Sequence, residues 1–251
     1  MPNYLNRVSL LPLVLVFACA AGDKSTQPPA NETFAASPSD SLGARFPAPK
    51  SALTIDAKSE KSLDDLLADV SRSTGVVFSI DENTVRPMLR KAHVSISQPV
   101  TIETGSVYPW FESLLTQHGF YLASLTDAAP PLVAVYARNS PQSHVGSPPS
   151  LAVPADRIDF CRQHPALLVT TTVDLPHVDV RTLGNSLRGI TGNDQAGMIM
   201  PAANTNTVVL SGTGQTIANL VDLLNRVESA AAQGGDWREA LQVEVKKASA
   251  K

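Results

Sequence analysis

Two glycines at a predicted strand-to-helix junction are the first candidates for chemistry. Gly212, Thr213 and Gly214 follow the apolar run 208–210 and precede a helical pattern. Glycine-rich turns at the start of a helix bind phosphate groups in nucleotide-binding proteins. A phosphate-binding loop, however, ends in Gly-Lys-Ser/Thr, and a dinucleotide fingerprint needs a third glycine where this chain has Ile217. We therefore predict that the turn only connects a strand to a helix.

The ionisable and nucleophilic side chains form no catalytic or metal-binding pattern. Cys161 and His164 offer one thiolate and one imidazole, whereas a zinc site needs three or four ligands. Asp64 and Asp65 stand at a predicted helix start, where the helix dipole favours negative charge. The sequence contains no G-x-S-x-G nucleophile motif. We expect a protein that is not an enzyme, with no catalytic residue, no metal and no cofactor.

Composition and charge narrow the classes of partner. The chain has 251 residues, a formal net charge of −3, and only 5% aromatic residues. An aliphatic core follows from the low aromatic content, and no basic stripe suited to nucleic acid is present. Two cysteines are too few for a disulfide framework. We expect no nucleic-acid partner and no small-molecule substrate.

The N-terminus is typical of an exported protein. One arginine precedes the apolar run Val8–Ala18, which is too short to span a membrane. The stretch Val16–Cys19 resembles a bacterial lipobox, so we expect residues 1–18 to be a signal peptide and Cys19 to be lipidated. This would place the protein in the periplasm, anchored to the outer membrane. Two alternatives stay open: ordinary cleavage at Ala18-Cys19-Ala20 with secretion, and a disulfide between Cys19 and Cys161.

Composition shifts divide the rest of the chain. Stretches rich in Pro, Ser and Ala bury too little apolar surface to offset the entropy of ordering. We therefore expect a disordered tether over residues 19–51 and a linker over residues 139–165. Two folded modules remain, residues 52–138 and 166–228, followed by a polar tail over residues 229–251.

Four apolar stripes at helical spacing predict two helices in each module. Ser62 and Asp65 form a candidate capping box at the start of the first helix. Gly119 suits the left-handed end of the second. The stripes are Leu63, Leu66, Leu67 and Val70; Val107, Trp110, Phe111, Leu114 and Leu115; Val180, Leu183, Leu187 and Ile190; and Ile217, Leu220, Val221, Leu224 and Val227.

Short alternating apolar runs between the stripes predict strands. The first module is therefore expected to be β-α-β-β-α-β-β and the second β-α-β-β-α, which makes two small α+β modules. Beyond them, the run Leu241–Val245 fits either a strand or a short helix or disordered end. Trp237 in this polar tail is a candidate for docking on a partner.

The order of these elements carries a family resemblance. The pieces VDLPHVDV, RTLGNSLRGIT, PAANTNTVVLSGTG and QTIANLVDLLNRVE resemble a periplasmic N-domain of the bacterial secretins, the outer-membrane channels of type II secretion and type IV pilus systems. The pieces LLADVSRSTGVVFSID, HVSISQPVTI and FESLLTQHGFYL are similar to the preceding secretin domain, which also occurs as the short N-terminal signalling domain of TonB-dependent receptors. For the second module the resemblance implies a KH-like fold.

The resemblance implies a non-catalytic scaffold or ring component that lacks its own pore, because a secretin continues into a channel-forming domain absent from this sequence. The implied partners are further copies of the chain, a separately encoded secretin channel, and the membrane through a lipid at Cys19. The alternative is a periplasmic signalling adaptor whose first module binds a membrane regulator. Two further interpretations are an enzyme of the cell envelope and a truncated secretin without a working role.

Overall fold

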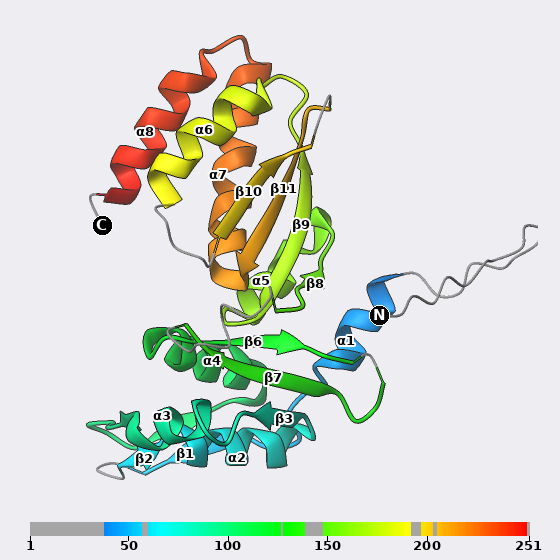
Figure 1. The fold of residues 1–251 in the computed structure, drawn as a ribbon. Coiled ribbons are helices and arrows are strands. Elements are labelled where there is room, and N and C mark those ends of the chain that lie inside the picture. The colour runs from blue at the N-terminus through cyan, green and yellow to red at the C-terminus, as the bar shows by residue number, and fades with distance from the viewer. Residues whose placement is uncertain are drawn as a thin grey trace, which may run out of the picture. The chain divides into compact units, whose positions relative to one another are not determined.

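The first module alternates short strands with helices. The computed structural model describes residues 38–56, 60–126, 128–138, 148–191, 197–202 and 205–249, and Figure 1 labels their elements. A short helix, α1 (Pro38–Arg45), precedes the first module. The module consists of β1 (Leu53–Ile55), β2 (Lys61–Ser62), α2 (Leu63–Thr74), β3 (Val77–Ile80), α3 (Val85–Lys91), β4 (His93–Val94), β5 (Val100–Ile102), the 3-10 turn η1 (Thr104–Ser106), α4 (Val107–Gln117), β6 (Phe120–Ser124) and β7 (Leu132–Ala137).

Helix α2 forms where the sequence supplies a cap, an apolar stripe and a terminator. The Ser62 hydroxyl accepts a hydrogen bond from the backbone N–H of Asp65, and the Asp65 carboxylate accepts one from the backbone N–H of Ser62. This reciprocal pair confirms the predicted capping box. Gly75 ends the helix with φ of 80°, a left-handed conformation that a glycine adopts at no steric cost. The predicted stripe is buried: Leu63, Leu66, Leu67 and Val70.

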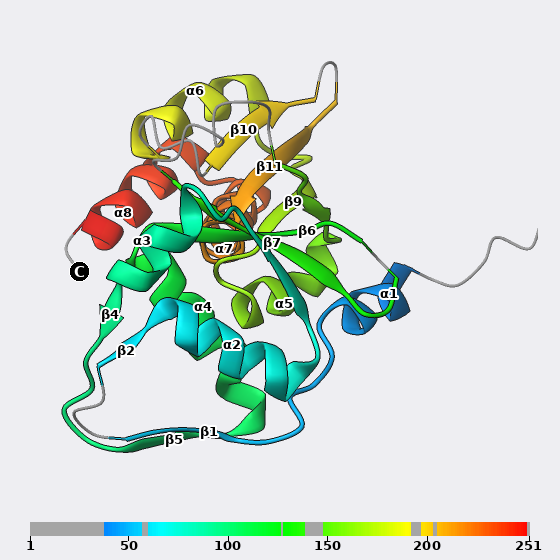
Figure 2. The same cartoon turned by 60° about the horizontal axis from the view of Figure 1, so that its bottom comes forward.

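Three small sheets frame the first module. The largest has the order β3-β7-β6, with β3 parallel and β6 antiparallel to β7. Strand β1 pairs with β5, and β2 pairs with β4, both antiparallel. Helices α2 and α4 contact each other, and α2 contacts β3 while α4 contacts β6; Figure 2 shows both helices in front of the sheet. Phe111 on α4 is fully buried between these layers.

Helix α3 has no counterpart in the predicted pattern. Its seven residues include only a few apolar side chains, of which Val85 and Leu89 are buried. The turn before it depends on Asp81, whose carboxylate accepts hydrogen bonds from the backbone N–H groups of Asn83 and Thr84. Such local side-chain turns give no periodic signal in a sequence.

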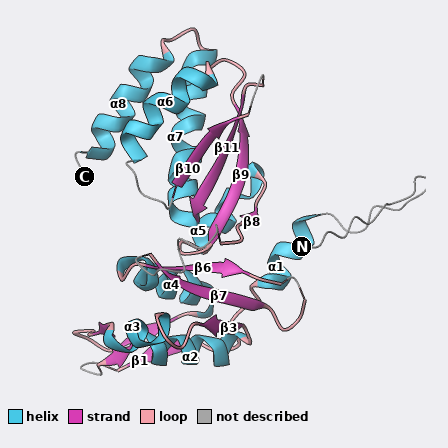
Figure 3. Ribbon diagram, in the orientation of Figure 1, coloured by secondary structure: helices cyan, strands magenta, loops and turns pink. Residues whose placement is uncertain are grey.

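The second module is a four-stranded sheet with helices. Its elements are β8 (Leu151–Ala152), the 3-10 turn η3 (Ala155–Arg157), α5 (Ile158–Gln163), β9 (Leu168–Asp174), α6 (Val180–Thr191), β10 (Gly197–Pro201), β11 (Thr207–Thr213), α7 (Gly214–Ala232) and α8 (Trp237–Ser249). The strand order is β10-β11-β9-β8, with β8 parallel to β9 and the other pairs antiparallel. Helix α7 packs on β9 and β11, and it is flanked by α5 and α8. Figure 3 separates these helices and strands by colour.

The structure confirms an α+β fold with the predicted β-α-β-β-α order in the second module, from β9 to α7. The described side chains of three helical stripes are buried, including Val180, Leu183 and Leu187 on α6. In the stripe on α4, Val107, Phe111 and Leu115 are buried, whereas Trp110 and Leu114 are only partly buried. None of the helices within the described ranges is long and apolar enough to cross a membrane.

Two segments that we expected to be unstructured carry helices or strands. The expected tether includes α1, and Leu42 and Phe46 are buried. The expected linker over residues 139–165 includes β8 and α5. These expectations were wrong there because a few apolar side chains in polar surroundings pack against the modules, and sparse apolar residues produce no periodicity.

The polar tail contains the end of α7 and all of α8. Of the alternatives left open for the run Leu241–Val245, the structure has the helix.

Replacing Ser62 by alanine tests the cap of α2. The loss of the hydroxyl leaves the Asp65 N–H without its side-chain acceptor, so we expect the free energy of unfolding to fall by about 1 kcal/mol. Ser106 also stands at a helix N-cap but makes no side-chain capping bond, and Ser106→Ala is the matched control. Urea unfolding of both variants measures the difference; equal stability of the two variants would contradict the prediction.

Candidate functional site

The glycine turn at residues 212–214 is closed by the chain's own carbonyl groups. The backbone N–H of Gly214 donates to the Leu167 carbonyl at 2.8 Å, and the N–H of Gln215 donates to the Pro165 carbonyl at 3.2 Å. A Cβ atom on Gly214 would lie 2.1 Å from the carbonyl oxygen of His164. Glycine is therefore needed here for close approach of α7 to the chain that follows α5, which is a packing role.

Cys161 and His164 lie at the end of α5, in the interior of the chain. Burial raises the pKa of the Cys161 thiol to about 11, against a smaller opposing effect of Arg162. The thiol is therefore protonated at neutral pH, which makes it a poor nucleophile and metal ligand. Among the described residues no group of three His, Cys, Asp or Glu side chains could hold a metal ion.

The imidazole of His164 binds a buried carboxyl group from the other module. Glu112 on α4 is fully buried, and His164 is only 4% exposed. The Nδ1 atom of His164 lies 2.8 Å from Oε1 of Glu112, and the backbone N–H of Ala166 donates to Oε2 at 3.0 Å. Both carboxyl oxygens from the first module are thus bound by the second. We call Glu112 and His164 the junction pair, and the Ala166 N–H is the backbone donor beside it.

Backbone contacts extend this junction. The N–H of Leu122 on β6 donates to the Ala166 carbonyl at 2.9 Å, and Leu122 forms a parallel β-bridge with Leu167. Aromatic rings surround the imidazole: the ring centroids of Tyr108 and Phe160 lie 4.9 Å and 4.6 Å from that of His164. The junction pair is therefore enclosed in an apolar, water-poor environment, where hydrogen bonds are strengthened and unpaired polar groups are costly.

Sequence reasoning missed Glu112. It follows the core residue Phe111 on α4 and occupies a position outside the predicted apolar stripe, so its sequence context is that of a solvated helix face. The partner that makes its burial possible is 52 residues away in the chain. His164 was considered only as a possible metal ligand. The sequence carries no signal that joins the two residues.

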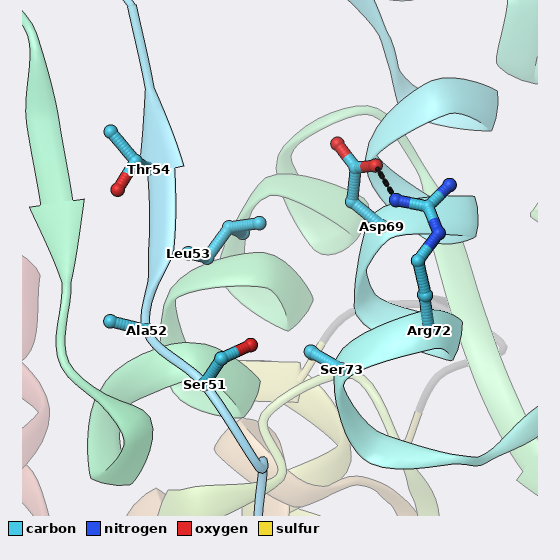
Figure 4. Close-up of a pocket in the computed structure, with 7 residues that line it drawn as sticks. All are labelled: Ser51, Ala52, Leu53, Thr54, Asp69, Arg72 and Ser73. Atoms are coloured by element: carbon cyan, nitrogen blue, oxygen red, sulfur yellow. Dashed lines mark hydrogen bonds and ion pairs between the residues drawn. The ribbon is translucent and has the colours of Figure 1, made fainter.

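A polar groove lies between strand β1 and helix α2. Strand β1 pairs with β5 along one edge, and no described strand pairs with its other edge. The groove has a volume of about 280 Å³ and is lined by Leu53 and by the charged pair Asp69 and Arg72 (Figure 4). Asp69 also binds Lys61 at 3.0 Å. The other lining residues are Ser51, Ala52, Thr54 and Ser73. The groove offers polar side chains beside an unpaired strand edge, a combination that suits an extended peptide.

Trp237 and Cys19 were also singled out from the sequence. Trp237 was a candidate for docking on a partner because it was expected to be exposed. It is only 8% exposed, because α8 packs against α7. Cys19 and the expected signal peptide, residues 1–18, lie outside the described residues.

The junction pair allows a direct stability test. Glu112→Ala removes the acceptor for both His164 and the Ala166 N–H and leaves buried polar groups without partners, so we expect a loss of about 3–5 kcal/mol of unfolding free energy. Glu82 forms an ion pair with Arg86 but its side chain is 64% exposed. Glu82→Ala is the matched control and should cost less than about 1 kcal/mol. Denaturant titration measures both, and comparable losses would refute a special role for Glu112.

Part of the second module is similar to a known protein family. The family described as "Bacterial type II/III secretion system short domain" matches residues 170–233. This range contains most of β9 and all of α6, β10, β11 and α7. No curated protein sequence matches the chain.

Three solved structures are similar to this chain, and the first of them shows a similar fold. The Klebsiella pneumoniae type II secretion system outer membrane complex, described as "PulD, PulS and PulC HR domain", matches with a TM-score of 0.52 and 16% identity. The match covers 69% of this chain and 26% of that one, so this chain spans about a quarter of its length. The enterotoxigenic Escherichia coli GspC-GspD complex matches with a TM-score of 0.27 and 16% identity. That match covers 72% of this chain and 100% of the other chain. The N-terminal domain of the secretin XcpQ from Pseudomonas aeruginosa matches with a TM-score of 0.27 and 16% identity, over 71% of this chain and 66% of that domain's chain.

The family match and the β-α-β-β-α order describe the same part of the molecule. Residues 170–233 match the family model of the bacterial type II/III secretion system short domain, and the chain has an α+β fold similar to that of secretin N-domains.

Proposed function

We propose that the protein is a non-catalytic periplasmic scaffold or ring component of a secretin-type secretion or type IV pilus system. It assembles with further copies of itself or with a separately encoded secretin channel. The observation that carries the proposal is the short domain at residues 170–233, set in a fold similar to that of secretin N-domains.

The described residues support a role in docking. The polar groups at the glycine turn, the junction pair and Cys161 are engaged in packing or hydrogen bonds inside the chain. The groove beside β1, in contrast, lies next to a strand edge with which no described strand pairs, and Asp69 and Arg72 of α2 line it. A partner strand added there would gain main-chain hydrogen bonds for affinity and charged contacts for specificity.

A long side chain in the groove tests this docking site. Ser51 is exposed and lines the groove, so Ser51→Arg fills the space that a partner strand would occupy. We expect the full-length protein, tagged and co-expressed with the secretin channel of its own host, to retain the channel. The Ser51→Arg variant should retain at least about ten-fold less, which corresponds to about 1.4 kcal/mol of binding free energy.

The control places the same side chain on another exposed surface. Ser113 on α4 is exposed and bonds only within its own helix, so Ser113→Arg should retain the channel as the unchanged protein does. A strictly monomeric protein that captures neither channel nor further copies would refute the scaffold. Selective capture of a membrane-bound regulator would favour the signalling adaptor instead.

Attachment to the membrane is the second part of the proposal, and Cys19 is its chemical basis. In cells fed labelled palmitate, we expect the protein to carry the label and Cys19→Ser to lose it, because the thiol is the only group of that side chain that forms the thioether anchor. Cys161→Ala removes the other cysteine and should keep the label. Absence of label from the unchanged protein would refute lipidation and leave ordinary secretion.

A further inference from the structure

The segment before the first module packs into the junction between the modules. Helix α1 (Pro38–Arg45) is followed by Phe46, which is only 7% exposed. The ring centroid of Phe46 lies 4.2 Å from that of His164 and 5.9 Å from that of Phe160, both in the second module. It also lies 5.8 Å from the ring of Tyr108 on α4, in an edge-to-face arrangement. One side chain therefore touches both modules at once.

Hydrogen bonds fix the chain on either side of this ring. The hydroxyl of Tyr108 donates to the Pro47 carbonyl at 2.8 Å. The backbone N–H of Lys50 donates to the Ser73 carbonyl at the end of α2, also at 2.8 Å. Burial of the Tyr108 hydroxyl raises its pKa to about 12, so it remains a donor throughout the physiological pH range. The segment from α1 to Lys50 is thus bound to the first module and reaches into the second.

The ring of Phe46 covers the junction pair. The His164 imidazole is packed against the rings of Phe46, Tyr108 and Phe160, and the same imidazole binds Glu112. Removal of the Phe46 ring would open one side of this enclosure to water. Water would then compete for the carboxyl group of Glu112, and the hydrogen bonds that join the modules would lose the advantage of a dry environment.

We propose that residues 38–47 form a strap that locks the two modules together. With the strap docked, the junction pair is dry and the modules move as one body. With the strap displaced, the junction opens while each module keeps its own core. The relative freedom of the modules is thus set by a segment that precedes both of them in the chain. The inference concerns this chain alone and does not depend on the proposed partner.

Hydrogen exchange on the full-length protein tests whether the strap holds the modules together, because the exchange rates of two backbone amides at the junction depend on that contact. The Ala166 N–H is bound to Glu112, and the Leu122 N–H is bound to the Ala166 carbonyl. In Phe46→Ala we expect both amides to exchange at least about ten-fold faster, the change produced by a loss of about 1.4 kcal/mol of local protection. Amides in the centre of α2 and of β11, far along the chain from the junction, should keep their rates.

The matched control removes an equally buried aromatic ring from another interface. Trp237 is 8% exposed on α8, and Trp237→Ala should speed exchange in α8 while leaving Ala166 and Leu122 unchanged. Unchanged junction amides in Phe46→Ala, or a uniform increase across both modules, would overturn the strap. If Phe46→Ala does not fold, Tyr108→Phe decides, since it keeps the ring and removes the hydroxyl that binds the Pro47 carbonyl. Faster exchange at Ala166 supports the lock, and an unchanged rate refutes it.

Discussion

A buried carboxyl group is the constraint on which the arrangement of the two modules depends. Glu112 projects from the first module with no exposed surface, and both of its oxygens are bound by groups of the second, the His164 imidazole and the Ala166 N–H. A polar group of this kind tolerates few alternatives, because any separation of the modules must either hydrate it or leave it without partners. Apolar contacts alone would permit sliding, whereas these hydrogen bonds require one alignment.

Several other features follow from that alignment. The chain around His164 must approach the start of α7 closely, which leaves room only for hydrogen at the Cα of Gly214. Helix α5 is held on its outer side as well, where Arg162 forms two hydrogen bonds, of 2.7 and 2.9 Å, with the carboxylate of Asp222 on α7. Residues 148–165 thus fold as a structured part of the second module, in which β8 and α5 precede the stretch that matches the family.

The sequence was sufficient where structure follows from local periodicity. The stripe on α2, its capping box and the left-handed Gly119 are all present as predicted, since each depends on residues within one or two turns. It was insufficient where structure depends on distant contacts. Helices α3, α5 and α8 are short or polar, and Phe46, Cys161 and Trp237 are buried only because another part of the chain covers them. For the same reason no local pattern marks Glu112 as buried. The groove beside β1, in contrast, borders a strand of the predicted pattern.

The packing of α8 has a consequence for where the second module ends. The family domain stops at residue 233, yet Trp237 and Leu241 of α8 are nearly as buried as the core and lie against α7. At the other end, Leu151 and Val153 are equally well covered. A fragment cut at the family boundaries would therefore expose the flanks of its longest helix and of its sheet to water, and would present adhesive apolar surface that the intact chain hides. The unit that keeps the apolar surfaces of this module covered is therefore longer at both ends than the stretch that matches the family.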